Sequence, residues 1–205
     1  AVFIVYQLAR VGRTVPTTNL LLAGVAVSSF ATALTSYLLL RATGDLRRAL
    51  VWQLGGSTMT GWEPVLGMLP YALAGLGIIL VNAYPLNVLQ FGDEQAQQMG
   101  VRVGRVRRWV VIAASMATAA AVAFAGVIGF VGLVVPHVIR LIWGGDYRRL
   151  LPFSILGGAV MLLLTDLAAR TLIAPQELPV GVLTSLLGAP FFLWVLRRSK
   201  SQNYW

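Results

Sequence analysis

The residues of this chain that could do chemistry are gathered mainly in one polar stretch, Gly92 to Arg108, which lies between two long apolar segments. Two acids at its start, Asp93 and Glu94, are followed by good helix formers and then by a glycine, Gly100. This order predicts a short helix with Asp93 as its N-cap and Gly100 in the left-handed conformation that ends it. Four arginines follow the helix, and the positive-inside rule predicts that this stretch faces the cytoplasm.

A second group of charged residues lies within apolar sequence. Asp166 and Arg170 are four residues apart with the acid on the N-terminal side, a spacing that pairs the two side chains on one helix face. Two interpretations stay open: a functional pair at membrane depth, or an arginine that reaches the lipid headgroups with Asp166 as its counter-ion. For His137 and Arg140, which follow Pro136, a packing or interface role is favoured.

Several kinds of catalytic site are excluded by the residues that the chain lacks. It has no cysteine and one histidine, so a thiolate site, a multi-histidine metal centre and an H-E-x-x-H protease motif are impossible. No phosphate-binding P-loop occurs, and the only lysine, Lys200, lies near the C-terminus. We therefore expect no enzyme activity, no metal and no cofactor; if ATP drives this protein, a partner must supply the ATPase.

The composition places the chain among membrane proteins. Apolar residues make up 58% and charged residues 11% of the sequence, and the mean hydropathy is +0.78. The net charge of +9 comes from arginines that cluster between apolar segments, where anionic lipid headgroups are the ready partner. We expect a lipid membrane, and no nucleic acid, as the partner of this charge.

Helical segments long enough to cross a bilayer core of roughly 30 Å need about 20 apolar residues. Four segments meet this length, namely Asn19–Leu40, Val65–Leu89, Leu150–Ala174 and Leu178–Leu196. A further segment, Trp109–Trp143, would run to roughly 50 Å as one helix, so it must break. Gly126, Gly129 and Gly132 predict the break, with one full helix that ends at Ala125 and a shorter helix at about 133–143.

The basic residues support this division. If the short helix at about 133–143 crosses back, twelve of the sixteen basic residues lie on the side of the polar stretch and four on the other side. The four are Arg41, Arg47, Arg48 and Arg170. The segment Asp45–Gly55 predicts a short amphipathic helix, either along the outer surface or as an ordered connection that packs on helix ends.

Small residues mark one expected contact between helices. Ala113, Ala117, Ala121 and Ala125 repeat every four residues and form a ridge that another helix can approach closely. Such a ridge indicates a helix bundle and carries no functional signal. The first ten residues read as the end of a membrane helix whose beginning is missing, and not as a signal peptide.

Several blocks of the sequence resemble the FecCD-type permease subunits of bacterial ABC importers for vitamin B12, ferric siderophores and haem. The blocks are Leu20–Ala26, Gly92–Gly100, Gly129–His137, Leu150–Pro152, Asp166–Arg170, Glu177–Gly181 and Leu187–Phe192. The resemblance implies an all-helical, polytopic membrane bundle of the vitamin B12 importer type. Six to seven of ten membrane segments would be present, the first three being absent, in a single permease domain over residues 1–205.

The resemblance also implies partners and a location. It suggests two copies of the permease around a central pathway, two cytoplasmic ATP-binding cassette subunits, and one periplasmic or lipid-anchored substrate-binding protein. The expected location is the bacterial cytoplasmic (inner) membrane. The cargo class, corrinoid, haem or ferric siderophore, stays open because the binding protein largely sets selectivity.

Site residues are carried over from the family position by position. The loop at 90–108 resembles the element that couples the permease to the ATPase, and its matching residues are Gly92, Asp93, Glu94, Gln95, Ala96 and Gly100. Arg170 matches an outer arginine that pairs with a glutamate of the binding protein. Thr17 and Thr18 resemble the cytoplasmic gate, at the start of a helix that lines the pathway.

Two other functions remain as alternatives. A secondary transporter or channel would be expected to carry acids near the bilayer midplane or broken helices paired across an inverted repeat, and Asp166 alone does not meet that pattern. A non-transporting scaffold would explain the spans but gives no reason for the polar stretch. Proton-dependent uptake without an ATPase would favour the first, and absence of uptake the second.

Overall fold

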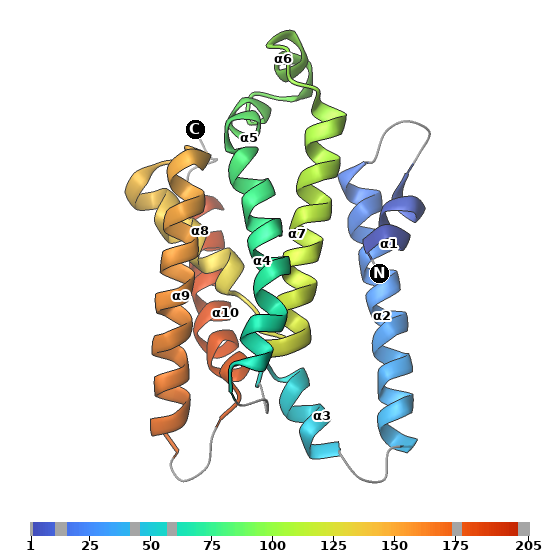
Figure 1. Ribbon diagram of the computed structural model, residues 1–205, viewed down its shortest axis with the longest axis vertical. Coiled ribbons are helices and arrows are strands. Elements are labelled where there is room, and N and C mark those ends of the chain that lie inside the picture. Colours follow the sequence, from blue (N-terminus) through green and yellow to red (C-terminus); the bar gives the residue numbers. More distant parts are fainter. Residues whose placement is uncertain (1, 11–15, 42–45, 57–60, 174–177, 201–205) are drawn as a thin grey trace. The chain divides into compact units, whose positions relative to one another are not determined.

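The computed structural model describes residues 2–10, 16–41, 46–56, 61–173 and 178–200, and every regular element in these ranges is an α-helix (Figure 1). Within these ranges, four helices are long and apolar enough to cross a membrane, and two shorter apolar helices accompany them. The prediction of an all-helical, polytopic bundle is confirmed. The chain divides into two compact units, residues 1–49 and 50–205, which are described separately.

The first unit is built on one long membrane helix. Helix α1 (Val2–Ala9) packs against α2 (Thr17–Arg41), which agrees with the span predicted at Asn19–Leu40. Side chains of α2 are largely exposed, as expected for a helix surrounded by lipid or by further helices. Helix α3 (Leu46–Gln53) confirms the predicted short helix and leads into the second unit.

The second unit contains seven helices among its described residues. They are α4 (Glu63–Val81), α5 (Ala83–Leu89), α6 (Asp93–Gln98), α7 (Val103–Ala125), α8 (Val131–Trp143), α9 (Tyr147–Thr171) and α10 (Val180–Lys200). The most extensive contacts join α4 to α7 and α8 to α9. Figure 1 shows α5, α6 and the start of α7 at one end of this unit, and the start of α10 at the other.

The contact between α4 and α7 uses the predicted ridge of small residues. A Cβ atom on Gly75 of α4 would lie 2.7 Å from the carbonyl oxygen of Ala113 and 2.9 Å from the Cβ of Ala117. The two backbones are therefore close enough that only glycine fits at this position. This is the close helix approach that the alanine spacing predicts.

The long apolar segment breaks where its glycines predict. Helix α7 ends at Ala125, Gly126 has a φ of +76°, and α8 starts at Val131 after Phe130, whose φ of +64° is left-handed. Helix α8 begins two residues earlier than expected and contains Pro136 in its interior. The break turns the chain back, so that α9 starts at the end of the unit where α5 lies.

Two other spans were predicted with wrong bounds. The segment 65–89 is two helices, α4 and α5, divided at Asn82. Pro85 has no N–H to donate to the carbonyl of Val81, and the side chain of Asn82 donates to the carbonyl of Ile78 at 2.7 Å. Helix α7 starts at Val103, six residues before the predicted Trp109, because the arginines of its first turns extend into exposed positions and do not oppose helix formation.

Three backbone segments meet at the end of the second unit opposite α6. The N–H of Val127 donates to the carbonyl of Trp52 and the N–H of Gly181 to that of Gly55, both at 3.3 Å. A Cβ atom on Gly126 would lie 2.3 Å from the oxygen of Trp52. Trp52 and Gly55, at the end of α3 and just after it, thus pack against the ends of other helices, as in the second sequence interpretation of the segment Asp45–Gly55.

We expect Gly181→Ala to destabilise the fold by about 2 kcal/mol or more, because the new methyl would lie 2.3 Å from the carbonyl oxygen of Leu54 and 2.8 Å from that of Val127. Both are backbone atoms and cannot turn aside. Thermal unfolding in detergent measures the effect. Gly77→Ala is the control, since nothing lies within 4 Å of its added Cβ; equal melting temperatures for both variants would contradict the prediction.

Candidate functional site

The candidate site is the polar end of the second unit, formed by α5, α6 and the start of α7. The N-cap of α6 is Gly92, with a φ of +102°, and not Asp93, which is the first helical residue and makes no capping hydrogen bond. The N-cap prediction is therefore wrong. The carboxylate of Asp93 instead accepts from Nη2 of Arg107, at 3.1 Å to Oδ1 and 3.2 Å to Oδ2.

The end of α6 has the predicted geometry. Gly100 has a φ of +81°, its N–H donates to the carbonyl of Gln97 at 2.9 Å, and the N–H of Val101 donates to that of Ala96 at 2.9 Å. This pair of bonds is the Schellman motif, which satisfies the last carbonyls of a helix and reverses the chain. It delivers the chain directly into α7.

One small residue anchors α6 to the rest of the unit. Ala96 is 0% exposed and lies in an apolar cluster with Val88 of α5 and Val103 of α7. By contrast, the side chains of Asp93, Glu94 and Gln95 are exposed. The helix therefore presents an acidic, polar face outward while its backbone is fixed at both ends.

A polar contact that the sequence interpretation missed joins α5 to the turn between α8 and α9. Asn87 donates from Nδ2 to Oδ1 of Asp146 at 2.5 Å and accepts at Oδ1 from the N–H of Tyr147 at 2.7 Å. Gln90 donates from Nε2 to Oδ1 of Asn87 and to the carbonyl of Gly145, both at 3.1 Å. We call Asn87, Gln90 and Asp146 the amide clamp.

Asp146 has two roles in this arrangement. Its carboxylate accepts from the N–H of Arg148 at 2.9 Å and so caps the N-terminus of α9. That bond and the one from Asn87 hold the pKa of Asp146 below its ordinary value of 3.8, although desolvation opposes the shift. Because the folded pKa is the lower one, this stabilisation is complete above the unfolded pKa and is lost as the pH falls through the folded pKa.

The amide clamp connects the start of α9 to the same short helix that leads into α6. A cation–π contact adds to it, since the guanidinium of Arg148 lies 5.1 Å from the ring centre of Tyr84 on α5. The sequence did contain a signal for this contact. Asn87 and Gln90 are polar residues in an apolar segment, and a polar side chain in such a segment usually has a partner.

Asp166 and Arg170 form the predicted ion pair on α9, with 2.9 Å between Oδ2 and Nε. The side chain of Arg170 is still 60% exposed. It lies at the opposite end of α9 from Asp146, roughly 36 Å away along the helix axis at about 1.5 Å per residue. The structure thus places the amide clamp and Arg170 at the two ends of one continuous helix.

The remaining candidate residues are placed as follows. Thr17 and Thr18 begin α2 in the first unit, so their predicted gate role stays a prediction. The ring of His137 meets that of Phe191 edge-on, with 6.1 Å between centroids, which agrees with the packing interpretation. In the part of the chain that the structure describes, no three side chains of the metal-binding types come together.

Comparisons with known proteins agree with this architecture. The FecCD transport family matches residues 1–198. The chain is 45% identical to the cobalamin import system permease protein of Halobacterium salinarum, with 96% of this chain and 53% of that protein covered. It is 42% identical to the hemin transport system permease protein of Yersinia pestis, with 98% and 60% covered.

Other similar proteins widen the range of cargo among the relatives. The Fe(3+) dicitrate transport system permease protein of Escherichia coli is 43% identical, over 89% of this chain and 57% of that protein. A solved structure described as an inward-facing conformation of a metal-chelate type ABC transporter matches with a TM-score of 0.81 and 32% identity, covering 89% of this chain and 59% of that one. The chain spans between half and three fifths of the length of these relatives.

We expect Asn87→Asp to lower the melting temperature of the protein, because it replaces the donor to Asp146 with a second carboxylate. Thermal unfolding in detergent at neutral pH measures the loss. Gln98→Glu makes the same amide-to-acid exchange on an exposed side chain of α6 and is expected to change little. Indistinguishable melting temperatures for the two variants would refute a structural role for the amide clamp.

Proposed function

The chain belongs to the FecCD transport family, and on this premise we propose that it is the membrane-spanning permease part of an ATP-driven importer. The proposed cargo is a corrinoid, haem or a ferric siderophore; the relatives are named for cobalamin, hemin and Fe(3+) dicitrate. The chain itself would hydrolyse no ATP. Its role would be to form the pathway and to transmit the movement of a separate ATPase.

The observation that carries this proposal is the construction of α6. A short helix with an exposed acidic start is fixed by a salt bridge from Asp93 to Arg107, by the buried side chain of Ala96 and by the turn at Gly100. Such a segment can transmit a push because it has few internal degrees of freedom. A flexible loop of the same composition would absorb the movement.

A route for the movement follows from the amide clamp. Displacement of α6 would move α5, and Asn87 of α5 holds the turn at Gly145 and Asp146, which starts α9. Helix α9 is continuous over 25 residues and carries Arg170 near its other end. We infer that the ATPase side and the outer side of the permease communicate through α5 and α9.

The proposed assembly contains two copies of the permease, two cytoplasmic ATPase subunits that receive α6, and one binding protein outside. The proposed location is the cytoplasmic membrane. In this assembly the exposed guanidinium of Arg170 would pair with an acid of the binding protein. Its bond to Asp166 would hold the side chain in place, since pre-ordering lowers the entropic cost of docking.

The alternative of a secondary transporter has little support from the acids of the described residues. Asp166 is paired near a helix end, Asp93 is paired on the polar end, and Asp146 caps a helix. None of the three is an isolated acid at mid-membrane depth, which proton- or sodium-coupled transport would require.

The direct test is ATPase activity of the protein reconstituted with its ATPase, with and without binding proteins loaded with cobalamin, haem or a ferric siderophore. Stimulation by one loaded binding protein would support the proposal and identify the cargo. Failure of the permease to associate with any ATPase would refute it, and proton-driven uptake would favour the secondary transporter.

We expect Glu94→Lys to reduce co-purification with the ATPase by about tenfold or more, since it reverses an exposed charge on the proposed docking face. Glu63→Lys makes the same charge reversal on an exposed side chain in the first turn of α4 and is the control. Because the exposed side chain of Glu94 makes no hydrogen bond or ion pair among the described residues, the melting temperature is expected to stay the same. Retained co-purification would remove α6 as the ATPase contact.

We expect Arg170→Glu to weaken stimulation by the binding protein about tenfold or more, with assembly on the ATPase unchanged. Asp166→Asn is the matched comparison, because it breaks the ion pair but leaves the guanidinium. If only the pair mattered, both variants would lose stimulation equally. Unchanged stimulation in Arg170→Glu would show that the binding protein docks elsewhere.

A further inference from the structure

The four arginines at the start of α7 are divided between two environments. Arg107 faces α6 and pairs with Asp93. Within the described ranges, the side chains of Arg102, Arg105 and Arg108 have no acidic partner, and their one side-chain hydrogen bond runs from Nε of Arg108 to the carbonyl of Gly104 at 3.2 Å. Three positive charges are therefore left beside one another on an exposed surface.

These three side chains line a groove of about 530 Å³ beside the turn that ends α6. Gly104 also lines the groove and has nothing within 4 Å of the position of a Cβ, so no side chain lies against it. No side chain caps the N-terminus of α7, so the partial positive charge of the helix end adds to that of the arginines. The groove suits a compact anion.

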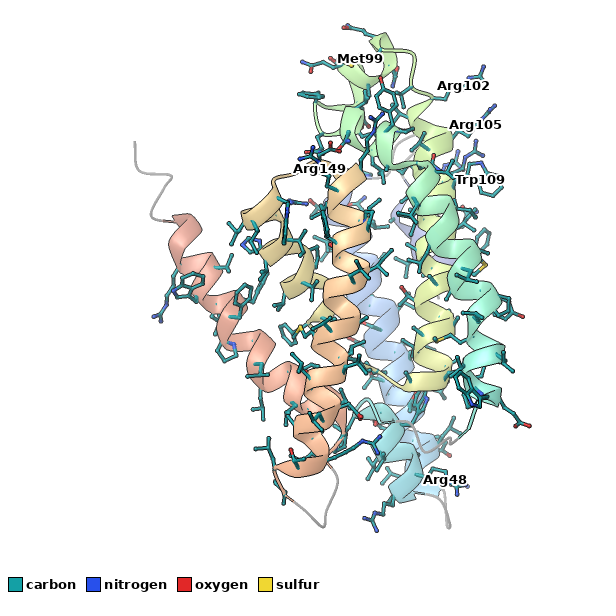
Figure 2. All side chains as sticks on the ribbon, turned by 60° about the vertical axis from the view of Figure 1, so that its left-hand side comes forward. Arg48, Met99, Arg102, Arg105, Trp109 and Arg149 are labelled. Carbon is teal, nitrogen blue, oxygen red and sulfur yellow. The ribbon has the colours of Figure 1, made fainter. Side chains whose placement is uncertain are left out.

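Along this side of α7, the type of side chain changes in the same order as the layers of a membrane. Figure 2 shows Arg102, Arg105 and Trp109 one below the other on this side. Trp109 is 51% exposed, and Ile112, which follows at helical spacing, is 54% exposed. Charged, aromatic and aliphatic side chains in this order match the headgroup layer, the interfacial layer and the acyl chains of a bilayer.

We propose that the groove formed by Arg102, Arg105 and Arg108 binds the headgroup of an anionic phospholipid, whose acyl chains lie along Trp109 and Ile112. Because Trp109 and Ile112 continue this side of α7 with apolar side chains, a lipid fits better than an acidic protein surface, which would need polar side chains on both sides of the arginines. The acidic face of α6 would remain available to the ATPase. This inference does not depend on the proposed transport activity.

The site has a structural consequence for α6. Arg107 stands on the same two helical turns as the groove and holds Asp93, so a lipid that fixes the start of α7 also fixes the attachment of α6. Each arginine near an anionic membrane surface strengthens binding by roughly fivefold. We therefore expect phosphatidylglycerol to be retained in preference to phosphatidylcholine.

The test is native mass spectrometry of the purified protein released from micelles that contain equal amounts of phosphatidylglycerol and phosphatidylcholine. We expect Arg105→Gln to reduce the preference for phosphatidylglycerol about fivefold. Arg107→Gln removes the same charge from the same helix but outside the groove, and is expected to leave the preference unchanged. Arg105→Lys is expected to restore most of it, because an ammonium group also pairs with phosphate.

Three outcomes would overturn the proposal. The preference could survive in the triple variant Arg102→Gln/Arg105→Gln/Arg108→Gln, or it could fall equally in Arg105→Gln and Arg107→Gln. In the third outcome, Arg105→Gln would lose co-purification with the ATPase but keep the lipid preference, which would assign the groove to an acidic protein surface. The melting temperature of each variant checks that it is folded, and the measurement requires no transport.

Discussion

The arrangement of the second unit depends on the hydrogen bonds that satisfy backbone N–H and C=O groups where the chain leaves α7. A helix satisfies its own N–H and C=O groups, but residues 126–130 are not helical, so their backbone groups need partners from other segments. The carbonyls of Trp52 and Gly55 accept from Val127 and Gly181 and supply part of this need. Glycine is required there because the three backbones are too close for side chains.

This interruption determines which ends of helices meet. Because α7 stops at Ala125, the short α8 returns the chain to the end where α5 and α6 lie, and α9 starts beside α5. The amide clamp then joins the two at Asn87 and Asp146. A single long helix in place of α7 and α8 would leave the start of α9 at the wrong end, and no connection from α6 to α9 would exist.

The charged residues fall into two groups: those with an oppositely charged partner in the described chain, and those without one. Asp93 with Arg107 and Asp166 with Arg170 are exposed pairs, each of which contributes little to stability but orients its side chains. The arginines of the groove have no acidic partner in the part of the chain that the structure describes. Because a charge without an internal partner is free to meet an external one, these residues mark the surfaces where partners or lipids are expected.

The sequence alone determined that the chain is a bundle of apolar helices, the break after Ala125, the turn at Gly100 and the pair of Asp166 and Arg170, because each depends on local composition or on spacing within one helix; it did not determine all of the helix bounds. It also pointed to the FecCD family. The division at Asn82 was readable from Pro85 but was missed, and Gly92 replaced Asp93 as the N-cap because the carboxylate has a better partner in Arg107. Only the tertiary structure decided the amide clamp, since Asn87 and Asp146 are 59 residues apart and no local rule brings them together.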